Sequence, residues 1–160
     1  MDSKSLFRYS QELRDRYLEQ LATLPWEEVV KSRGASFDSL RNIFLHTVDA
    51  EDRLINYIIL GRTKDWVSLS MDDFRDMDSI RKRAREVETK SRNYVAKLDL
   101  AELEKKVEMP RMGGSISVRV EDVIVHAALE NIHHFGELIA LLWQMDLDPA
   151  HMGWLAYLQK

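Results

Sequence analysis

The chain has 160 residues, a formal net charge of −4 at pH 7 and no cysteine. This length suits one domain with its own hydrophobic core, and we expect that domain to span residues 1–160. The lack of cysteine excludes disulfides, iron–sulfur clusters, thiolate zinc sites and cysteine nucleophiles, while the mild acidity argues against a nucleic-acid partner.

Glycine and proline are scarce and lie between periodic segments, which predicts long helices with few turns. Apolar residues at helical spacing indicate a first helix from Leu6 to Leu24, closed by Pro25. A second helix is expected to start at Ser36, a favourable N-cap residue, and to end at Gly61, which occupies a C-cap position. The polar stretch 62–77 is expected to be an ordered loop.

The second half of the chain predicts two more long helices, one from about Asp78 to Leu98 and one from Val120 to Met145. Between them, residues 102–117 are expected to form a small hairpin or an extended excursion. Asp148-Pro149 pairs an N-cap residue with a proline at the first helical position, so a short terminal helix is expected through Tyr157. Together these elements predict an all-α four-helix bundle.

The last long helix carries polar residues inside its apolar seam. The seam runs through Val123, Ala127, Glu130, His134, Leu138, Leu141 and Met145. Glu130 and His134 are four residues apart, so their side chains lie one turn from each other on the same face. Because a carboxylate is almost never fully buried without a partner, this pair indicates a metal site or a proton-transfer pair. The structural alternative is a buried ion pair or hydrogen-bonded pair.

A third candidate ligand, His46, follows the apolar residues Ile43 and Phe44 of the second helix. His46, Glu130 and His134 would form a three-ligand set that leaves positions open for water or substrate. Such a set suits zinc, nickel or iron(II), and the ligands alone do not choose among them.

Further polar residues lie close to this set in the sequence. Asp49 or Asp52 could accept the free ring proton of His46, with a solvated acidic face as the alternative, which we prefer for Asp52. His126 could be a fourth ligand, although its position drifts about 80° around the helix from that of His134. His133 is expected to face another helix or solvent. The basic run 81–85 is expected to be a solvated helix face.

The segment from His126 to Leu142 resembles the last-helix motif of the DinB-like (DNA-damage-inducible, YfiT-type) family, His-x-x-x-His-Arg-Gly-Gln followed by a hydrophobic residue. His134-Phe135-Gly136-Glu137-Leu138 aligns with the second histidine and its tail, and residues 43–54 resemble the helix-two histidine region. This resemblance implies a four-helix bundle with an unusual crossover topology, often dimeric. It also implies a divalent metal held by one histidine of helix two and two of the last helix. Relatives include thiol-dependent transferases and isomerases.

The sequence departs from that pattern at three positions: Glu130 replaces the first histidine, Phe135 the arginine and Glu137 the glutamine. A carboxylate ligand would shift the metal preference toward iron(II) or manganese.

Two hypotheses for the function follow. The first is a metal-dependent enzyme, a hydrolase or a thiol-dependent transferase acting on a small molecule, whose zinc, nickel, iron or manganese ion is held by His46, Glu130 and His134. The second is a non-catalytic dimeric bundle in which Glu130 and His134 form a buried pair. A homodimer is expected. The first ten residues do not resemble a signal peptide and the apolar runs are too short for a bilayer, so we expect a cytoplasmic protein without membrane contact.

Overall fold

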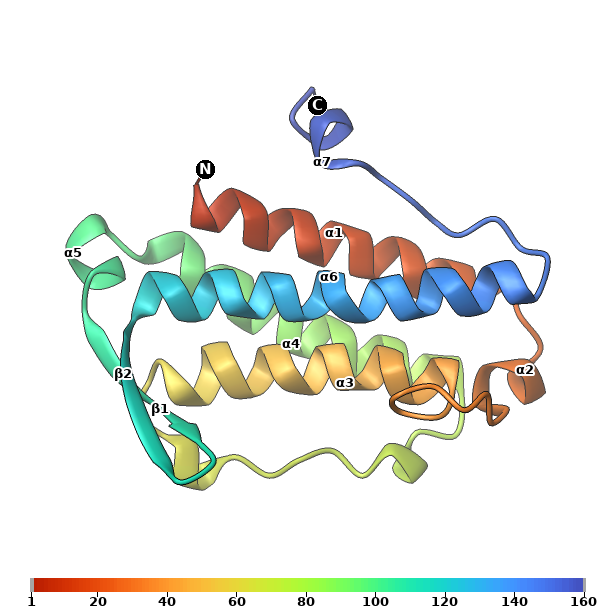
Figure 1. Ribbon diagram of the computed structural model, residues 1–160, viewed down its shortest axis with the longest axis horizontal. Helices are drawn as coiled ribbons and strands as arrows, with labels where there is room; N and C mark the ends of the chain where they lie inside the picture. The colour runs from red at the N-terminus through yellow and green to blue at the C-terminus, as the bar shows by residue number, and fades with distance from the viewer. Residues whose placement is uncertain (1, 160) are drawn as a thin grey trace.

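The computed structural model describes residues 2–159, and its framework is a bundle of four long helices (Figure 1). These are α1 (Ser3–Leu21), α3 (Leu40–Arg53), α4 (Met77–Lys97) and α6 (Val120–Gln144). Helix α6 packs between α1 and α3, and α4 packs between the same two helices on the opposite side. The expected all-α bundle is therefore confirmed, with its core of buried leucine, isoleucine, valine and phenylalanine side chains between the four helices.

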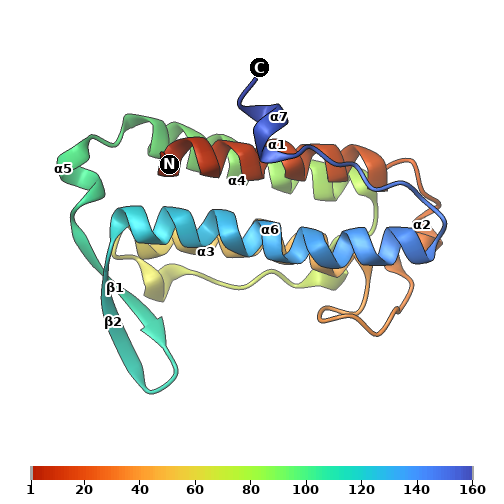
Figure 2. The same ribbon diagram turned by 45° about the horizontal axis from the view of Figure 1, so that its top comes forward.

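This packing order places α1 diagonally opposite α3, and α4 diagonally opposite α6. Two of the three connections between long helices must therefore cross an end of the bundle. The first crossing contains the short helix α2 (Trp26–Val30). The second contains α5 (Leu100–Leu103) and an antiparallel hairpin of β1 (Lys106–Arg111) and β2 (Gly114–Arg119), which projects from the end of the bundle where α6 begins (Figure 2). The hairpin is one of the two forms expected for this stretch.

The connection between α3 and α4 runs along the bundle and contains two single turns of 3-10 helix, η2 (Thr63–Asp65) and η3 (Met71–Asp73). Helix α3 continues directly into a π-helical turn, η1 (Leu54–Ile58), and the chain leaves the helix through a turn that ends at Gly61, whose φ of +67° favours glycine. The helix therefore ends before Gly61, at Ile58, with Ile59 and not Gly61 as its C-cap residue, and the π turn has no counterpart in the periodicity of the sequence.

Two helix starts differ from expectation. The second long helix is capped by Ser39, whose Oγ accepts a hydrogen bond from the backbone N–H of Asn42 at 3.2 Å, and not by Ser36. The terminal helix α7 (Trp154–Tyr157) begins later than Asp148-Pro149. The reason is Gln20, whose side chain donates to the carbonyl of Asp148 and accepts from the N–H of Ala150, both at 2.6 Å. These contacts hold the segment extended along α1.

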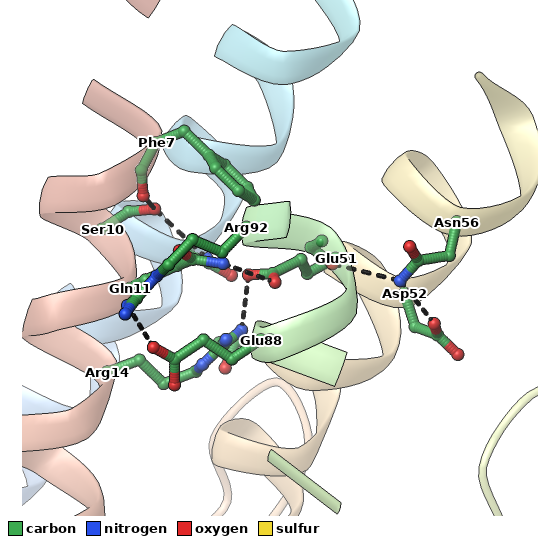
Figure 3. A network of polar contacts seen from close by, with 12 residues as sticks. Phe7, Ser10, Gln11, Arg14, Glu51, Asp52, Asn56, Glu88 and Arg92 are labelled. Atoms are coloured by element: carbon green, nitrogen blue, oxygen red, sulfur yellow. Dashed lines mark hydrogen bonds and ion pairs between the residues drawn. The ribbon is translucent and has the colours of Figure 1, made fainter. Parts of the chain in front are cut away.

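A network of polar side chains crosses the middle of the bundle between α1, α3 and α4 (Figure 3). The carboxylate of Glu51 accepts hydrogen bonds from Gln11 at 2.9 Å and from Arg14 at 2.7 Å, and all three side chains are buried. Arg92 of α4 donates to Gln11 at 3.2 Å and pairs with Glu88. This network was not predicted from the sequence. Within residues 2–159, no helix is both long and apolar enough to span a bilayer.

Candidate metal centre

The three predicted ligands converge where α3 packs against α6. His46 of α3 and His134 of α6 both turn their Nε2 atoms toward one oxygen of Glu130. The distances to Glu130 Oε1 are 3.3 Å from His46 and 3.2 Å from His134, and the two imidazole centroids are 4.5 Å apart. His46, which lies 84 positions before Glu130 in the chain, therefore joins two residues that are one turn apart on α6.

Glu137 contacts the other ring nitrogen of His134, Nδ1. Its Oε1 lies 2.6 Å from His134 Nδ1, and its two oxygens accept hydrogen bonds from the Oγ and the backbone N–H of Ser36 at 2.8 and 3.2 Å. Because a neutral imidazole carries one N–H, the short contact places that proton on Nδ1. The lone pair of His134 Nε2 then faces the oxygen of Glu130.

The connection between α1 and α3 also supplies an aromatic wall. The ring of Phe37 stacks on His46 with centroids 3.9 Å apart and meets His134 edge-on at 5.4 Å. Neither this role of Phe37 nor the contact of Ser36 with Glu137 was predicted from the sequence. Glu137 could have been found, because it lies three residues after His134 and therefore on the same helix face. Nothing local in the sequence indicated Phe37.

The electrostatics favour the protonation states that a metal requires. Burial lowers the pKa of His46, against the opposing effect of its hydrogen bond to Glu130, so the neutral imidazole is favoured. Burial opposes ionisation of Glu130, but the contacts of its carboxylate with His46 and His134 outweigh this effect and lower the pKa of the carboxyl. Glu137 behaves in the same way, because hydrogen bonds from Ser36 and His134 outweigh its desolvation.

The donor spacing fits a metal ion as well. Bonds of roughly 2.0–2.2 Å to zinc in a tetrahedral arrangement set neighbouring ligand atoms roughly 3.3–3.6 Å apart. The observed separations of 3.2 and 3.3 Å from Glu130 Oε1 lie close to that spacing. One donor atom from each of His46, Glu130 and His134 can be chosen so that all lie within 4.8 Å of one another. Two imidazoles and a carboxylate are ordinary ligands for zinc, nickel, iron and manganese.

The seam of α6 differs from the prediction at one position. Asn131, not Glu130, is the fully buried polar residue, and Glu130 lies at the edge of the seam with its side chain 30% exposed. The reason is that α6 packs on both α1 and α3, so the buried face is wider than a single row and Asn131 occupies its middle. His134 is buried, as expected.

The two neighbouring acidic candidates, Asp49 and Asp52, each have a partner other than His46. Asp49 accepts hydrogen bonds from Ser68 Oγ at 3.0 Å and from the N–H of Leu69 at 3.3 Å, and burial raises the pKa of its carboxyl. It therefore orients the 62–76 connection, and the prediction that it accepts a proton from His46 has no matching hydrogen bond within residues 2–159. Asp52 pairs with Arg83 at 2.6 Å instead of facing solvent as expected.

Of the remaining histidines on α6, His133 is exposed and lies beside His134, where it could join Glu137 in an alternative cluster. His126 is exposed at its helix position but lines a pocket next to the candidate metal centre. This pocket has a volume of about 220 Å³ and lies between α3, α6, the hairpin and the 62–76 connection. Its lining includes His46, Asp49, Arg53, Trp66, Met109 and Glu130.

Comparison with known proteins agrees with this architecture. The search of curated proteins finds no match. The family model of the DinB superfamily matches residues 10–138, a range that contains α3, the hairpin and both α6 members of the candidate metal centre. The chain therefore belongs to the DinB superfamily.

Proposed function

We propose that the protein is a metal-dependent enzyme in which His46, Glu130 and His134 hold one divalent ion. The observation that carries the proposal is the convergence of three donors, because the Nε2 atoms of His46 and His134 lie 3.3 and 3.2 Å from the same oxygen of Glu130. The contact of Glu137 with His134 Nδ1 favours a proton on that nitrogen, which would leave Nε2 free to hold a cation together with Glu130 and His46.

The other side chains have roles that follow from their contacts. Glu137, held by Ser36, fixes the orientation and tautomer of His134. Phe37 covers His46 and limits the access of water from that side. Three protein ligands leave coordination positions open. When bound, a metal of this kind acts as a Lewis acid that lowers the pKa of a water or a thiol, so the supported reactions are hydrolysis and thiol transfer on a small molecule.

Elemental analysis of protein made without a histidine tag tests the proposal. We expect about one zinc, nickel, iron or manganese ion per chain, and loss of that ion in His46→Ala and in His134→Ala. His133→Ala is the matched control, because His133 precedes His134 on the same helix but is exposed. Full metal content in both ligand variants would contradict the proposal. So would a folded wild-type protein that takes up no divalent ion, which would favour a non-catalytic bundle with a Glu130–His134 pair.

We further propose that the protein is a homodimer formed through the outer face of α6. From Val123 to Trp143 this helix carries no lysine or arginine, and its two carboxylates both belong to the candidate metal centre. Leu129 and Trp143 are 51% and 63% exposed. They lie two turns on either side of Gly136, so an antiparallel pairing of two α6 helices about Gly136 would set Leu129 against Trp143 of the partner subunit.

Gly136 supports a second copy as the occupant of this face. A Cβ atom at this position would meet nothing within 4 Å, so packing within the chain does not require a glycine there. Glycine in a helix interior costs about 1 kcal/mol relative to alanine. The close approach of a second helix, which a Cβ atom would block, would explain why a glycine is present despite this cost. An uncharged, self-complementary face suits another copy of the chain better than a charged partner.

A further inference from the structure

The pocket beside the candidate metal centre contains an arginine without a carboxylate partner. Six other arginines that are at least partly buried all form ion pairs: Arg14, Arg33, Arg41, Arg81, Arg83 and Arg119. Arg53 forms none within residues 2–159, and its guanidinium instead lies over the ring of Trp66, 4.9 Å from the centroid. A partly buried arginine that lines a pocket and forms no ion pair is a candidate site for an anion.

Two buried donors strengthen this interpretation. Arg53 Nε and Trp66 Nε1 are both buried without a hydrogen-bond partner among the described residues. A buried donor without an acceptor costs about 1–3 kcal/mol, and most such groups in folded proteins are satisfied. Arg53 and Trp66 both line the 220 Å³ pocket that also reaches His46 and Glu130. A ligand that brings a negatively charged group would therefore supply the ion-pair partner that Arg53 lacks within residues 2–159.

We propose that this pocket binds the carboxylate of a small organic acid, with the guanidinium of Arg53 as its anchor, the Trp66 ring beside it and the remainder of the molecule directed to the metal centre. The proposal rests on the proposed function and names the substrate class for it. A planar guanidinium matches a carboxylate in a two-point contact. A monoanion is favoured over a phosphate dianion, because one arginine shares the lining with the carboxyls of Asp49 and Glu130.

The rest of the lining limits the body of the ligand. Ala50, Leu54 and Met109 provide apolar surface, which suits a short hydrocarbon chain. The volume of about 220 Å³ lies below the range of pockets that hold drug-sized ligands, so the acid is a small one.

A matched pair of probes tests the proposal: butyrate and its neutral isostere butyramide, with inorganic phosphate as a third. The reporter is the indole N–H resonance of Trp66 in nuclear magnetic resonance spectra, assigned with Trp66→Phe. We expect butyrate to shift this resonance and to bind at least about 10-fold more tightly than butyramide or phosphate. Arg53→Gln should remove this preference, and Arg53→Lys, which keeps the charge without the planar fork, should weaken it less.

Arg75→Gln is the matched control, because Arg75 is exposed, lies outside the pocket and gives the same change in net charge. Equal binding of butyrate and butyramide would overturn the proposal, as would tighter binding of phosphate. An Arg53→Gln variant that matches Arg75→Gln in butyrate affinity would do the same. Unchanged butyramide binding in Arg53→Gln shows that the variant is folded.

His134→Ala separates this proposal from the metal site, since His134 does not line the pocket. We expect this variant to lose metal and to keep Arg53-dependent butyrate binding. If butyrate binding is lost in His134→Ala but survives in Arg53→Gln, the carboxylate goes to the metal, which refutes the arginine anchor and leaves the proposed function intact. A wild-type protein that takes up no divalent ion but still prefers butyrate through Arg53 would refute the proposed function alone.

Discussion

Glu137 links the connection between α1 and α3 to the candidate metal centre, because it contacts both Ser36 and His134. Its carboxylate accepts a hydrogen bond from the Nδ1–H of His134 and is itself held by Ser36. Hydrogen-bond partners of metal-ligating histidines affect metal affinity by about 10–100-fold. We expect Glu137→Ala to weaken metal binding by that factor at unchanged stoichiometry, measured by competition with a chelator. Glu121→Ala, which removes a contact with Arg119 at the start of the same helix, is the control. Equal affinities in the two variants would show that Glu137 does not orient the ligand.

The titration of Glu88 is expected to make the free energy of unfolding depend on pH. Burial and the neighbouring Asp15 raise its pKa to about 7, although Arg92 pairs with it. The pKa in the folded protein is therefore above the unfolded value. The folded state binds more protons between about pH 4.5 and 7, and stability falls as the pH rises through this range.

We expect Glu88→Gln to be more stable than the wild type at pH 8 by about 1–3 kcal/mol, and to differ little at pH 5. Urea denaturation at both pH values measures the difference. Glu86→Gln, at an exposed position of the same helix, should leave the pH dependence unchanged. Parallel stability curves for wild type and Glu88→Gln would rule out a raised pKa at this position.

Helices α1 and α3 are joined across the bundle diagonal by a buried ion pair. Arg14 and Glu51 are 1% and 0% exposed in their side chains, and Arg14 Nε and Nη2 have no hydrogen-bond partner among the described residues. Removing one member leaves an uncompensated charge, so Glu51→Ala should destabilise the fold by about 3–5 kcal/mol. The double variant Arg14→Met/Glu51→Leu should recover most of that loss, as measured by thermal or urea unfolding. A double variant as unstable as Glu51→Ala would mean that lost packing, and not the stranded arginine, causes the effect.

The sequence predicts the parts of the site that lie on long helices. The spacing of Glu130 and His134 gives their common face, and His46 beside Ile43 and Phe44 gives its position on the second helix. The contacts that residues of the connections make with the site could not be predicted, because the path of each connection depends on contacts between residues far apart in the sequence. Ser36, for example, reaches Glu137 from a turn in which Asp38 adopts a φ of +73°, and no periodicity signals that turn.

The crossover topology of the bundle explains why the connections between the long helices are long. α3 and α6 are neighbours, so their facing side chains can form the candidate metal centre directly. The connections then surround it: the first brings Ser36 and Phe37, the 62–76 stretch brings Trp66, and the hairpin brings Met109. Tight antiparallel turns would leave the centre open on these sides. The length of the links is therefore part of how the bundle builds a pocket.

The outer face of α6 predicts the assembly of the molecule. If two copies pair about Gly136, Leu129→Glu places a buried, unpaired carboxylate opposite Trp143 of the partner subunit, and the dimer should dissociate at micromolar concentration. Light scattering coupled to size-exclusion chromatography should give the mass of two chains for the wild type and of one chain for the variant. The control is Leu100→Glu, because Leu100 is 82% exposed on α5, away from this face. A wild-type protein that elutes with the mass of one chain would refute the dimer. Two variants that both remain dimeric would place the interface elsewhere.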